Sequence, residues 1–476
     1  MQLRLEAFNN SELEKIHRAT LEVLEKTGVK TGSEKVRDLL KEKGADVEGD
    51  IVKFPSAMVE KAIGKINKTV TLAARDPRYT VTLPAKNTIH STSGYSAFTY
   101  DMESSKKRPS NSADLVDYAV LADALDEIGI FWPIVMPTEI EPESLQELSA
   151  LDISFRNCTK HVQCSVADPD TAARQVKLAA VLAGGQDKLR ENPLFSVVAS
   201  PFTPLKFEDG TAEAYLIMAR AGIPVVPMNV PLAGTTAPAS MAGAIVVTNA
   251  EQLAVLIILK CADESAPMVY SSDTGTADMT SGDINYDTPD RPILCAAMAQ
   301  VARFYNIPSC VSHDSCEDKP YKIRQGFERN ALRIAMNMMD HSDLAIWLGS
   351  LDNALSASMW DMLLDSEAAK LANEYNRWFE VDDKTLAVGP INEEGPGGNF
   401  LLNDHTVENY RDTISLYKYQ NNLLNYESEG SEDDFVEKAK ARVREILASH
   451  KPIAIPDDKL KAMDEIMDEA RRSING

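Results

Sequence analysis

The sequence is poor in basic residues for its size. Its 476 residues include 49 Lys and Arg against 72 Asp and Glu, which gives a formal net charge of -23 at pH 7. A field of this sign repels the phosphates of nucleic acids and the headgroups of anionic lipids. We therefore expect no nucleic acid and no membrane surface among its partners.

Long apolar runs are missing as well. The longest, such as residues 253–259, fall far short of the about 20 residues that span a bilayer. Residues 1–12 show no secretory signal, because no apolar run follows a basic start. The six cysteines form no close CxxC pair, which is typical of reduced thiols in a cytosol. We expect a cytoplasmic protein without disulfides.

The sequence also lacks a glycine-rich phosphate turn. No GxGxxG follows any predicted strand, whereas an open doubly wound sheet usually places one after its first strand. From residue 88 onward, short apolar or β-branched runs alternate with helical patterns, so that each predicted strand precedes a predicted helix. The eight predicted strands are residues 88–93, 129–135, 161–166, 194–199, 225–230, 268–272, 309–313 and 343–348. This rhythm favours an α/β fold, the closed (β/α)8 TIM barrel.

The pattern divides the chain into three regions. Residues 1–84 combine helical periodicity with short alternating stretches around 69–74 and 79–83, which predicts an N-terminal helical and short-strand segment. Residues 85–379 form the predicted barrel domain. Residues 380–476 form a C-terminal extension with a Gly-Pro loop and charged helices.

Aromatic residues stand at the ends of the first and last predicted strands, which are neighbours in a closed barrel. In TIM barrels the chemistry lies at the C-terminal ends of the strands, and Tyr95, Phe98 and Trp347 stand there. Quaternary ammonium groups donate no hydrogen bonds and are held by aromatic faces. These three rings could form an aromatic cage around such a cation. Alternatively, Trp347 fills the barrel and Tyr95 packs under a loop.

Polar and small residues complete the predicted rim. His313, at the end of the seventh strand, could bind a substrate carboxylate or move a proton, or be a satisfied rim histidine. Asn229 ends the fifth strand, and Gly234 lies in the small-residue loop 231–238. That loop opens a helix and could hold a carboxylate, or be an ordinary turn.

The segment 394–400 has the backbone freedom of a loop that folds over a mouth. Its candidate residues are Glu394, Gly397 and Gly398, and a plain turn is equally compatible. No strand end carries an HxH or HExxH pattern, so we expect no metal site.

Together these motifs resemble the trimethylamine methyltransferase (MttB-like) family, in particular its members that lack pyrrolysine. The likeness spans most of residues 90–410 and several loops share it. It is carried by Gly94-Tyr95, Asp101-Met102-Glu103, Pro231 to Pro238 with Met241-Ala242-Gly243-Ala244, Asn249-Ala250-Glu251, Ser312-His313-Asp314-Ser315 with Asp318, Gly349-Ser350-Leu351-Asp352 and Glu394-Gly395-Pro396-Gly397-Gly398-Asn399-Phe400.

The resemblance implies a barrel that docks a corrinoid protein over its mouth and passes a methyl group from an amine to Co(I). The chain contains only standard residues, so the amine-activating adduct of the trimethylamine enzymes is missing. A quaternary amine needs no such adduct, because its nitrogen is already positive. The resemblance therefore points to glycine betaine, with dimethylglycine as product. No corrinoid motif of the DxHxxG kind occurs, so the corrinoid is expected on the partner protein, with none bound by this chain.

Several alternatives stay open. The substrate could be carnitine, proline betaine or gamma-butyrobetaine, or the barrel could bind a betaine without turning it over. A lyase or decarboxylase using His313 and Asp314 is a third class. We also expect a homo-oligomer.

Overall fold

The barrel prediction is confirmed. The structure, a computed structural model, describes residues 4–286, 288–313, 320, 324–375, 379–415 and 432–474. Eight parallel strands pair in the order β13-β11-β10-β9-β6-β19-β18-β15, and parallel bridges Val225–Met268 and Asn229–Ser272 join the two outer strands into a nearly closed barrel. The strands are β6 (Ile89–Ser91), β9 (Ile128–Phe131), β10 (His161–Ser165), β11 (Phe195–Val198), β13 (Val225–Val226), β15 (Tyr270–Ser271), β18 (Ser309–His313) and β19 (Leu344–Ile346).

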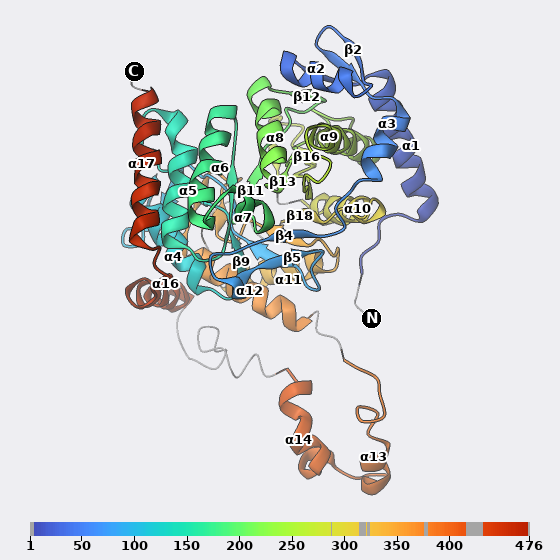
Figure 1. The fold of residues 1–476 in the computed structure, drawn as a ribbon. Helices are drawn as coiled ribbons and strands as arrows, with labels where there is room; N and C mark the ends of the chain where they lie inside the picture. Colours follow the sequence, from blue (N-terminus) through green and yellow to red (C-terminus); the bar gives the residue numbers. More distant parts are fainter. Residues whose placement is uncertain are drawn as a thin grey trace.

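One long helix follows each strand, as predicted, and the helices surround the barrel (Figure 1). They are α4 (Ser112–Ala124), α5 (Gln146–Asn157), α6 (Pro169–Ala183), α8 (Asp209–Ala221), α9 (Met241–Ala262), α10 (Asp290–Phe304), α11 (Arg324–Met338) and α12 (Met359–Tyr375). The short α7 (Gln186–Glu191) follows α6 and was not predicted. Most strands are shorter than the apolar runs, because those runs continue past the last paired residue.

Local sequence signals set where these helices begin and end. Asn111 and Asp114 form a reciprocal capping box at the start of α4. Asp168 caps α6, whose first residue is Pro169, and Gly184 ends it with a φ of 87°. Proline at the first position and glycine in the left-handed conformation at the end are the residues that these two backbone positions favour.

The N-terminal segment covers one side of the barrel and closes its foot. Its elements are α1 (Asn10–Lys26), β1 (Val29–Thr31), α2 (Glu34–Glu42), β2 (Asp46–Glu48), β3 (Ile51–Lys53), α3 (Ser56–Ile63), β4 (Val70–Leu72), the 3-10 turn η1 (Pro77–Tyr79) and β5 (Val81–Leu83). Strands β4 and β5 form the predicted antiparallel pair, and their side chains join the barrel interior. The small sheet of β1, β2 and β3 was not predicted, and β1 pairs with β12 (Lys206–Phe207) of the barrel domain.

Two further sheets stand at the mouth, where the strands end. One pairs β7 (Phe98–Tyr100) and β8 (Lys107–Pro109) with β20 (Ser350–Leu351) and β21 (Ser356–Ala357). The other joins β14 (Leu232–Ala233), β16 (Gly275–Ala277) and β17 (Ile284–Asn285). Both connect loops that lie far apart in sequence, which explains why local patterns did not predict them.

The C-terminal extension divides into two parts. Helices α16 (Glu432–Ser449) and α17 (Asp457–Ile474) pack back on the barrel helices, α16 against α12 and α4 and α17 against α6. Residues 379–415, here called the arm, carry α13 (Val388–Glu394), the 3-10 turn η3 (Phe400–Leu402) and α14 (Asp404–Thr413). The arm stands off from the barrel below α11 and α12 (Figure 1).

Among the described residues, α9 is the one helix long and apolar enough to cross a membrane. It is mostly buried within the protein and packs against α1, α3, α8 and α10. Its apolar surface is therefore that of a core helix.

Candidate active site

Aromatic side chains line the mouth end of the barrel interior. Side chains alternate along a strand, so Ile130 and Trp132 face the same side, and both belong to the interior apolar cluster with Ile346 and Trp347. Trp132 lies in the middle of the predicted strand 129–135, and the sequence patterns did not single it out as a site residue. The two-residue alternation along that strand is the signal that could have found it.

Two neighbours hold Trp132 in place. Its backbone N–H donates to Thr92 Oγ1 at 2.9 Å, and the Thr92 hydroxyl donates to its carbonyl at 2.6 Å. A Cβ on Gly94 would lie 2.2 Å from Trp132 Nε1, so only glycine fits there. The indole N–H is buried, and no partner for it occurs among the described residues. A buried donor of this kind is available to a ligand.

Trp347, just beyond β19, belongs to the same interior cluster as Trp132. It is buried, with a φ of 94°, a conformation that costs a non-glycine residue of order 1–3 kcal/mol and is found at functional sites. Its ring meets the ring of Tyr286 edge-on at a centroid distance of 4.3 Å, and that of His313 at 5.0 Å. The sequence placed Trp347 and His313 here, but not Tyr286.

Asp273, just beyond β15, is the centre of a buried polar group. Its carboxylate accepts from the Tyr286 hydroxyl at 2.6 Å, pairs with the Arg291 guanidinium, and lies 2.9 Å from His313 Nε2. Burial opposes ionisation of Asp273, but the charges of Arg291 and His313 and the hydrogen bonds outweigh it and lower its pKa to about 2. Asp273 is therefore a carboxylate at any physiological pH.

Arg291, the second residue of α10, lies within the aromatic group. Its guanidinium carbon is 4.6 Å from the ring centroid of Tyr286 and 5.5 Å from that of Trp347. One set of aromatic faces is thus already used by a cation of the protein itself. Its Nε is buried, and the described part of the chain offers that nitrogen no hydrogen-bond partner.

His313 ends β18 as predicted and is buried rather than exposed at the rim. Its Nδ1 is 3.5 Å from Cys295 Sγ, while Nε2 faces Asp273. Both ring nitrogens therefore contact the protein, and the ring edge supports Trp347. Asp314, Ser315 and Asp318, which accompany it in sequence, lie outside the described residues.

Tyr95 packs at the junction of the barrel interior with the helix layer. It has a φ of 70°, and its hydroxyl accepts the backbone N–H of Ser165 at 3.1 Å. Burial raises the pKa of Tyr95 well above its ordinary value. Nearby Glu147 has its pKa raised to about 7 by burial, partly offset by the backbone N–H of Ala167. The sequence patterns did not single out Glu147, because its raised pKa results from burial in the folded protein.

Two other predicted residues have partners of their own. The ring of Phe98 on β7 faces the ammonium of Lys107 at 4.7 Å, in the sheet beside the mouth. Asn229 is fully buried, and its amide nitrogen donates to Glu251 Oε2 at 2.6 Å. Its oxygen accepts from Gln252 at 3.2 Å. Asn229 thus joins the segment after β13 to α9.

Gly234 lies in a turn of the mouth loops with a φ of 102°. A Cβ there would meet Met279 Sδ at 2.8 Å, so the residue allows two loops to approach. Its amide donates to the carbonyl of Ala237 at 3.1 Å and is not directed to a ligand.

The predicted loop over the mouth is not found there. Glu394, Gly397 and Gly398 lie in the arm, where Glu394 accepts from Asn403 at 2.8 Å and the Gly398 amide donates to Gly395. The arm begins after α12, and a barrel helix runs back from the mouth to the foot. The arm therefore leaves the barrel at the end opposite the mouth, which the sequence pattern could not reveal.

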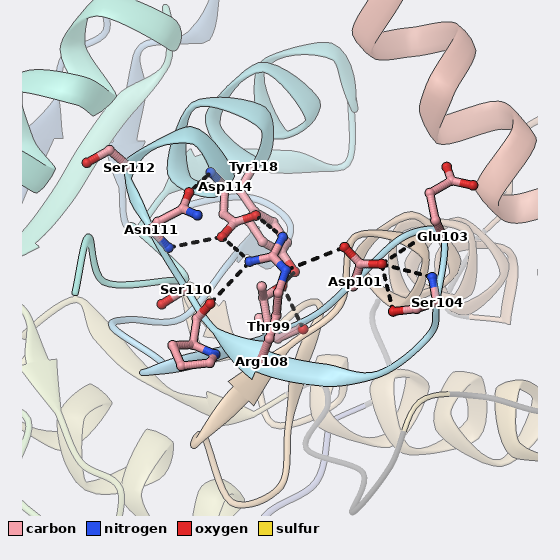
Figure 2. Close-up of polar contacts among 12 residues, drawn as sticks. Thr99, Asp101, Glu103, Ser104, Arg108, Ser110, Asn111, Ser112, Asp114 and Tyr118 are labelled. Atoms are coloured by element: carbon pink, nitrogen blue, oxygen red, sulfur yellow. Dashed lines mark hydrogen bonds and ion pairs between the residues drawn. The ribbon is translucent and has the colours of Figure 1, made fainter. Parts of the chain in front are cut away.

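The Asp101-Met102-Glu103 motif has a local structural role. Figure 2 shows Asp101 at the β7–β8 turn, where it accepts from the backbone and side chain of Ser104, both at 2.8 Å. These bonds lower the pKa of Asp101 to about 2. Arg108 joins this turn to α4 through two 2.7 Å bonds to Asp114 (Figure 2). The motif fixes the hairpin that flanks the mouth.

The described part of the mouth thus offers aromatic faces, a buried ion pair and two buried N–H donors that have no partner among the described residues. Within the described residues, no group of three or more His, Cys, Asp or Glu could hold a metal ion. This chemistry suits binding and positioning of a small charged molecule more than proton transfer.

Comparisons with known proteins agree with this arrangement. A family model described as trimethylamine methyltransferase (MTTB) matches residues 2–475. The chain is 30% identical over 469 residues to "Trimethylamine methyltransferase MttB" of Desulfitobacterium hafniense, covering 98% of this chain and 94% of that one. It is 28% identical over 460 residues to "Glycine betaine methyltransferase" from another strain of that organism, covering 96% and 95%.

A solved structure shows the same fold. The monomethylamine methyltransferase of Methanosarcina barkeri superimposes with a TM-score of 0.52 at 12% identity, over 99% of this chain and 88% of the other. At that identity the likeness concerns the barrel architecture alone. The family match extends over nearly the whole length, and on that basis this chain belongs to the trimethylamine methyltransferase (MTTB) family.

Proposed function

We propose that this protein transfers a methyl group from glycine betaine to the Co(I) corrinoid of a separate partner protein in the cytoplasm, releasing dimethylglycine. The observation that carries this proposal is the combination of aromatic faces with the buried Asp273–Arg291 pair at the barrel mouth. A zwitterion with a permanent cation and a carboxylate fits both: its ammonium group is attracted by rings and by a carboxylate, and its carboxylate by N–H donors.

The cationic end has a place beside the rings. Trp132 and Trp347 share the interior cluster, with Tyr95 and Tyr286 packed against it. Since Arg291 lies over Tyr286 and Trp347, we assign the trimethylammonium group to the remaining faces, those of Trp132 and the far side of Trp347. The negative charge of Asp273 adds attraction for a cation.

The carboxylate end needs donors. The two buried N–H groups without partners in the described part of the mouth, Trp132 Nε1 and Arg291 Nε, are the best candidates. A hydrogen bond to a charged acceptor contributes about 1.5–3 kcal/mol, whereas a buried donor left without one costs about 1–3 kcal/mol. A bound substrate carboxylate would accept hydrogen bonds from these two N–H groups and remove the free-energy cost of leaving them without an acceptor.

The chemistry makes little demand on acid or base groups. The nitrogen–methyl bond breaks with its electron pair staying on nitrogen, which turns the quaternary ammonium into the neutral tertiary amine of dimethylglycine. The corrinoid of the partner supplies the electron pair for the new cobalt–carbon bond, as Co(I) becomes methyl-Co(III). No proton moves at the reacting nitrogen, so the chain's task is to orient the substrate and exclude water.

The residue content of the chain supports a quaternary amine as the substrate. Its relatives are named for trimethylamine and for glycine betaine. This sequence contains only standard residues, so the pyrrolysine that the resemblance links to trimethylamine turnover is missing. A betaine needs no activation by such a residue, because its nitrogen already carries a positive charge.

The surface around the mouth supports docking of a partner protein. Among the described residues, five large apolar side chains are exposed on the segments that follow the barrel strands; they are Phe98 on β7, Phe202, Met279, Ile293 and Leu355. Here we call them the mouth rim. Exposed apolar groups rimmed by polar residues are typical of protein interaction sites. A partner seated there could bring its corrinoid to the substrate.

The test is methylation of a reduced corrinoid protein, followed by the change in corrinoid absorbance. Glycine betaine should be demethylated, whereas trimethylamine and choline should be poor substrates. Faster turnover of carnitine, proline betaine or gamma-butyrobetaine would move the assignment to that betaine. Tight betaine binding without any turnover would favour a binding protein, which the lack of an evident acid, base or metal group also suits. Corrinoid bound in stoichiometric amount to the isolated chain would contradict a separate carrier.

A further inference from the structure

Among the residues that the structure describes, half of the exposed large apolar side chains lie in the arm. Twenty such side chains are exposed among the described residues, and ten of them fall within residues 379–415, exposed by 41–86%. They are Phe379, Val381, Leu386, Val388, Ile391, Phe400, Leu401, Leu402, Val407 and Ile414. The other half is spread over the rest of the chain.

The arm cannot bury these side chains by itself. None of the residues of α13, η3 and α14 is buried. Helices of 7 and 10 residues without a packed face are marginal in water. Ten side chains of this size expose on the order of 1,000 Å² in total, more than the largest patch of a typical monomer and comparable to one side of a stable interface of about 800 Å².

A surface that could receive such an arm lies where the arm begins. On α11, Leu332 and Met336 are four residues apart on one face and are both exposed, and Tyr375 at the end of α12 is exposed as well. This surface leads to a cavity of about 1470 Å³ at the foot of the barrel, which Met338 and Phe379 help to line. We call α11, the end of α12 and this cavity the foot surface.

The arm is acidic, whereas the foot cavity has a small excess of basic residues. The arm holds eight acidic residues and two basic ones, Lys384 and Arg411. The lining of the foot cavity contains the basic residues Arg4, Lys68, Lys86 and Arg303 and the acidic residues Asp343, Glu374 and Glu380, of which Glu380 belongs to the arm. One terminal guanidinium nitrogen of Arg303 is buried, with no acceptor among the described residues.

We infer that two copies of this chain exchange arms, each arm covering the foot surface of the other copy. Phe379 and Glu380 belong both to the root of the arm and to the lining of the cavity, so the two surfaces are adjacent in each copy. If a two-fold axis passes beside the root of the arm, the arm of each copy contacts the foot surface of the other. The same contact then occurs twice in one isologous interface. Exchange leaves the mouth free, because the arm and the foot lie at the opposite end of the barrel.

The experiment is the molar mass of the full-length chain in solution, by light scattering at micromolar concentration. We expect twice the chain mass of 52.3 kDa, or an even multiple of it. The double variant Leu401→Asp/Leu402→Asp should lower the mass by at least half. Met336→Asp, which changes the receiving surface on α11, should do the same. Met279→Asp on the mouth rim is the matched control, since Met279 is equally exposed and should leave the mass unchanged.

Mixing two tagged populations identifies the contact. Chains with Leu402→Cys and chains with Met336→Cys should give a disulfide-linked pair that carries both tags. A monomeric parent, or an unchanged mass for both Asp variants, would overturn the exchange. Arm variants that keep their mass but lose methylation of the corrinoid protein would assign the arm to that partner instead. None of these readouts depends on which amine the barrel binds.

Discussion

Gly94 lies against the indole of Trp132 so closely that a Cβ would come within 2.2 Å of Nε1. The two residues come from the loop after β6 and from the end of β9, which are neighbours in the barrel. We expect Gly94→Ala to force the indole out of position, because ring and backbone cannot both stay. Betaine binding, measured by calorimetry, should weaken by at least tenfold, and preserved affinity would show that Trp132 is not part of the site.

Trp132→Phe tests the indole N–H separately from the ring. Losing one hydrogen bond to a carboxylate should raise the KM for glycine betaine about 10- to 100-fold. Binding of choline, which has no carboxylate, should weaken less, because it loses only the difference in cation–π attraction between an indole and a phenyl ring. The control is Trp360→Phe, because Trp360 is also buried with an Nε1 that lacks a described partner, but it lies in the helix layer. Equal effects of both variants on betaine would argue against a ligand role.

Asp273→Asn should destabilise the fold strongly. It leaves the buried charge of Arg291 without its counter-ion, and breaking a buried pair in this way costs about 3–5 kcal/mol. The control Glu469→Gln breaks the exposed pair with Lys177 and should change stability little. Denaturant unfolding measures both variants. The double variant Asp273→Asn/Arg291→Met should recover part of the loss, since it also removes the unpaired cation.

His313→Ala should affect binding more than the methyl-transfer step. His313 contacts Asp273 and the edge of Trp347, so it acts as a positioning residue for both. We expect a strongly raised KM for glycine betaine with a smaller loss in kcat, and partial rescue by His313→Gln. Steady-state kinetics with the corrinoid protein separates the two. An unchanged KM would remove His313 from the substrate site.

Glu147 should make stability depend on pH. Burial raises its pKa from 4.5 to about 7 in the folded protein, so the folded state holds its proton more tightly than the unfolded state does. Stability should therefore fall as the pH rises from about 4.5 to 7, by on the order of 3 kcal/mol for a shift of this size. Glu147→Gln should remove this loss. Unfolding of parent and variant at pH 5 and pH 8 measures it, and equal pH dependence would contradict the assignment.

Some site residues were accessible from the sequence. Trp347 and His313 follow or end clear strand patterns, and the structure brings their rings to 5.0 Å. The expectation that the first and last strands are neighbours is confirmed by the pairing of β6 with β19. The assignments of substrate-binding roles to Tyr95, Phe98, Asn229 and Gly234 stay predictions, although Phe98 and Asn229 have partners within the protein.

Other parts of the site needed the coordinates. Asp273 directly follows the predicted strand 268–272, but Tyr286 lies just after β17 and Arg291 at the start of α10, and no periodicity joins these two residues to it. Their contact depends on how the loops beyond β15 fold back on the mouth. The arm is a similar case, because its apolar residues resemble those of a packed helix in the sequence, and only the structure leaves them exposed.

What the sequence by itself determined is the succession of eight strand–helix units and the acidic character of the chain, because residue spacing acts locally and charge acts as a sum over the chain. Only the tertiary structure decided that Trp132 faces the barrel interior, that Arg291 occupies the aromatic faces of Tyr286 and Trp347, and that the arm leaves from the foot. Side-chain direction at a strand end and the path of a loop depend on contacts between residues far apart in the chain, and these form only when the barrel closes.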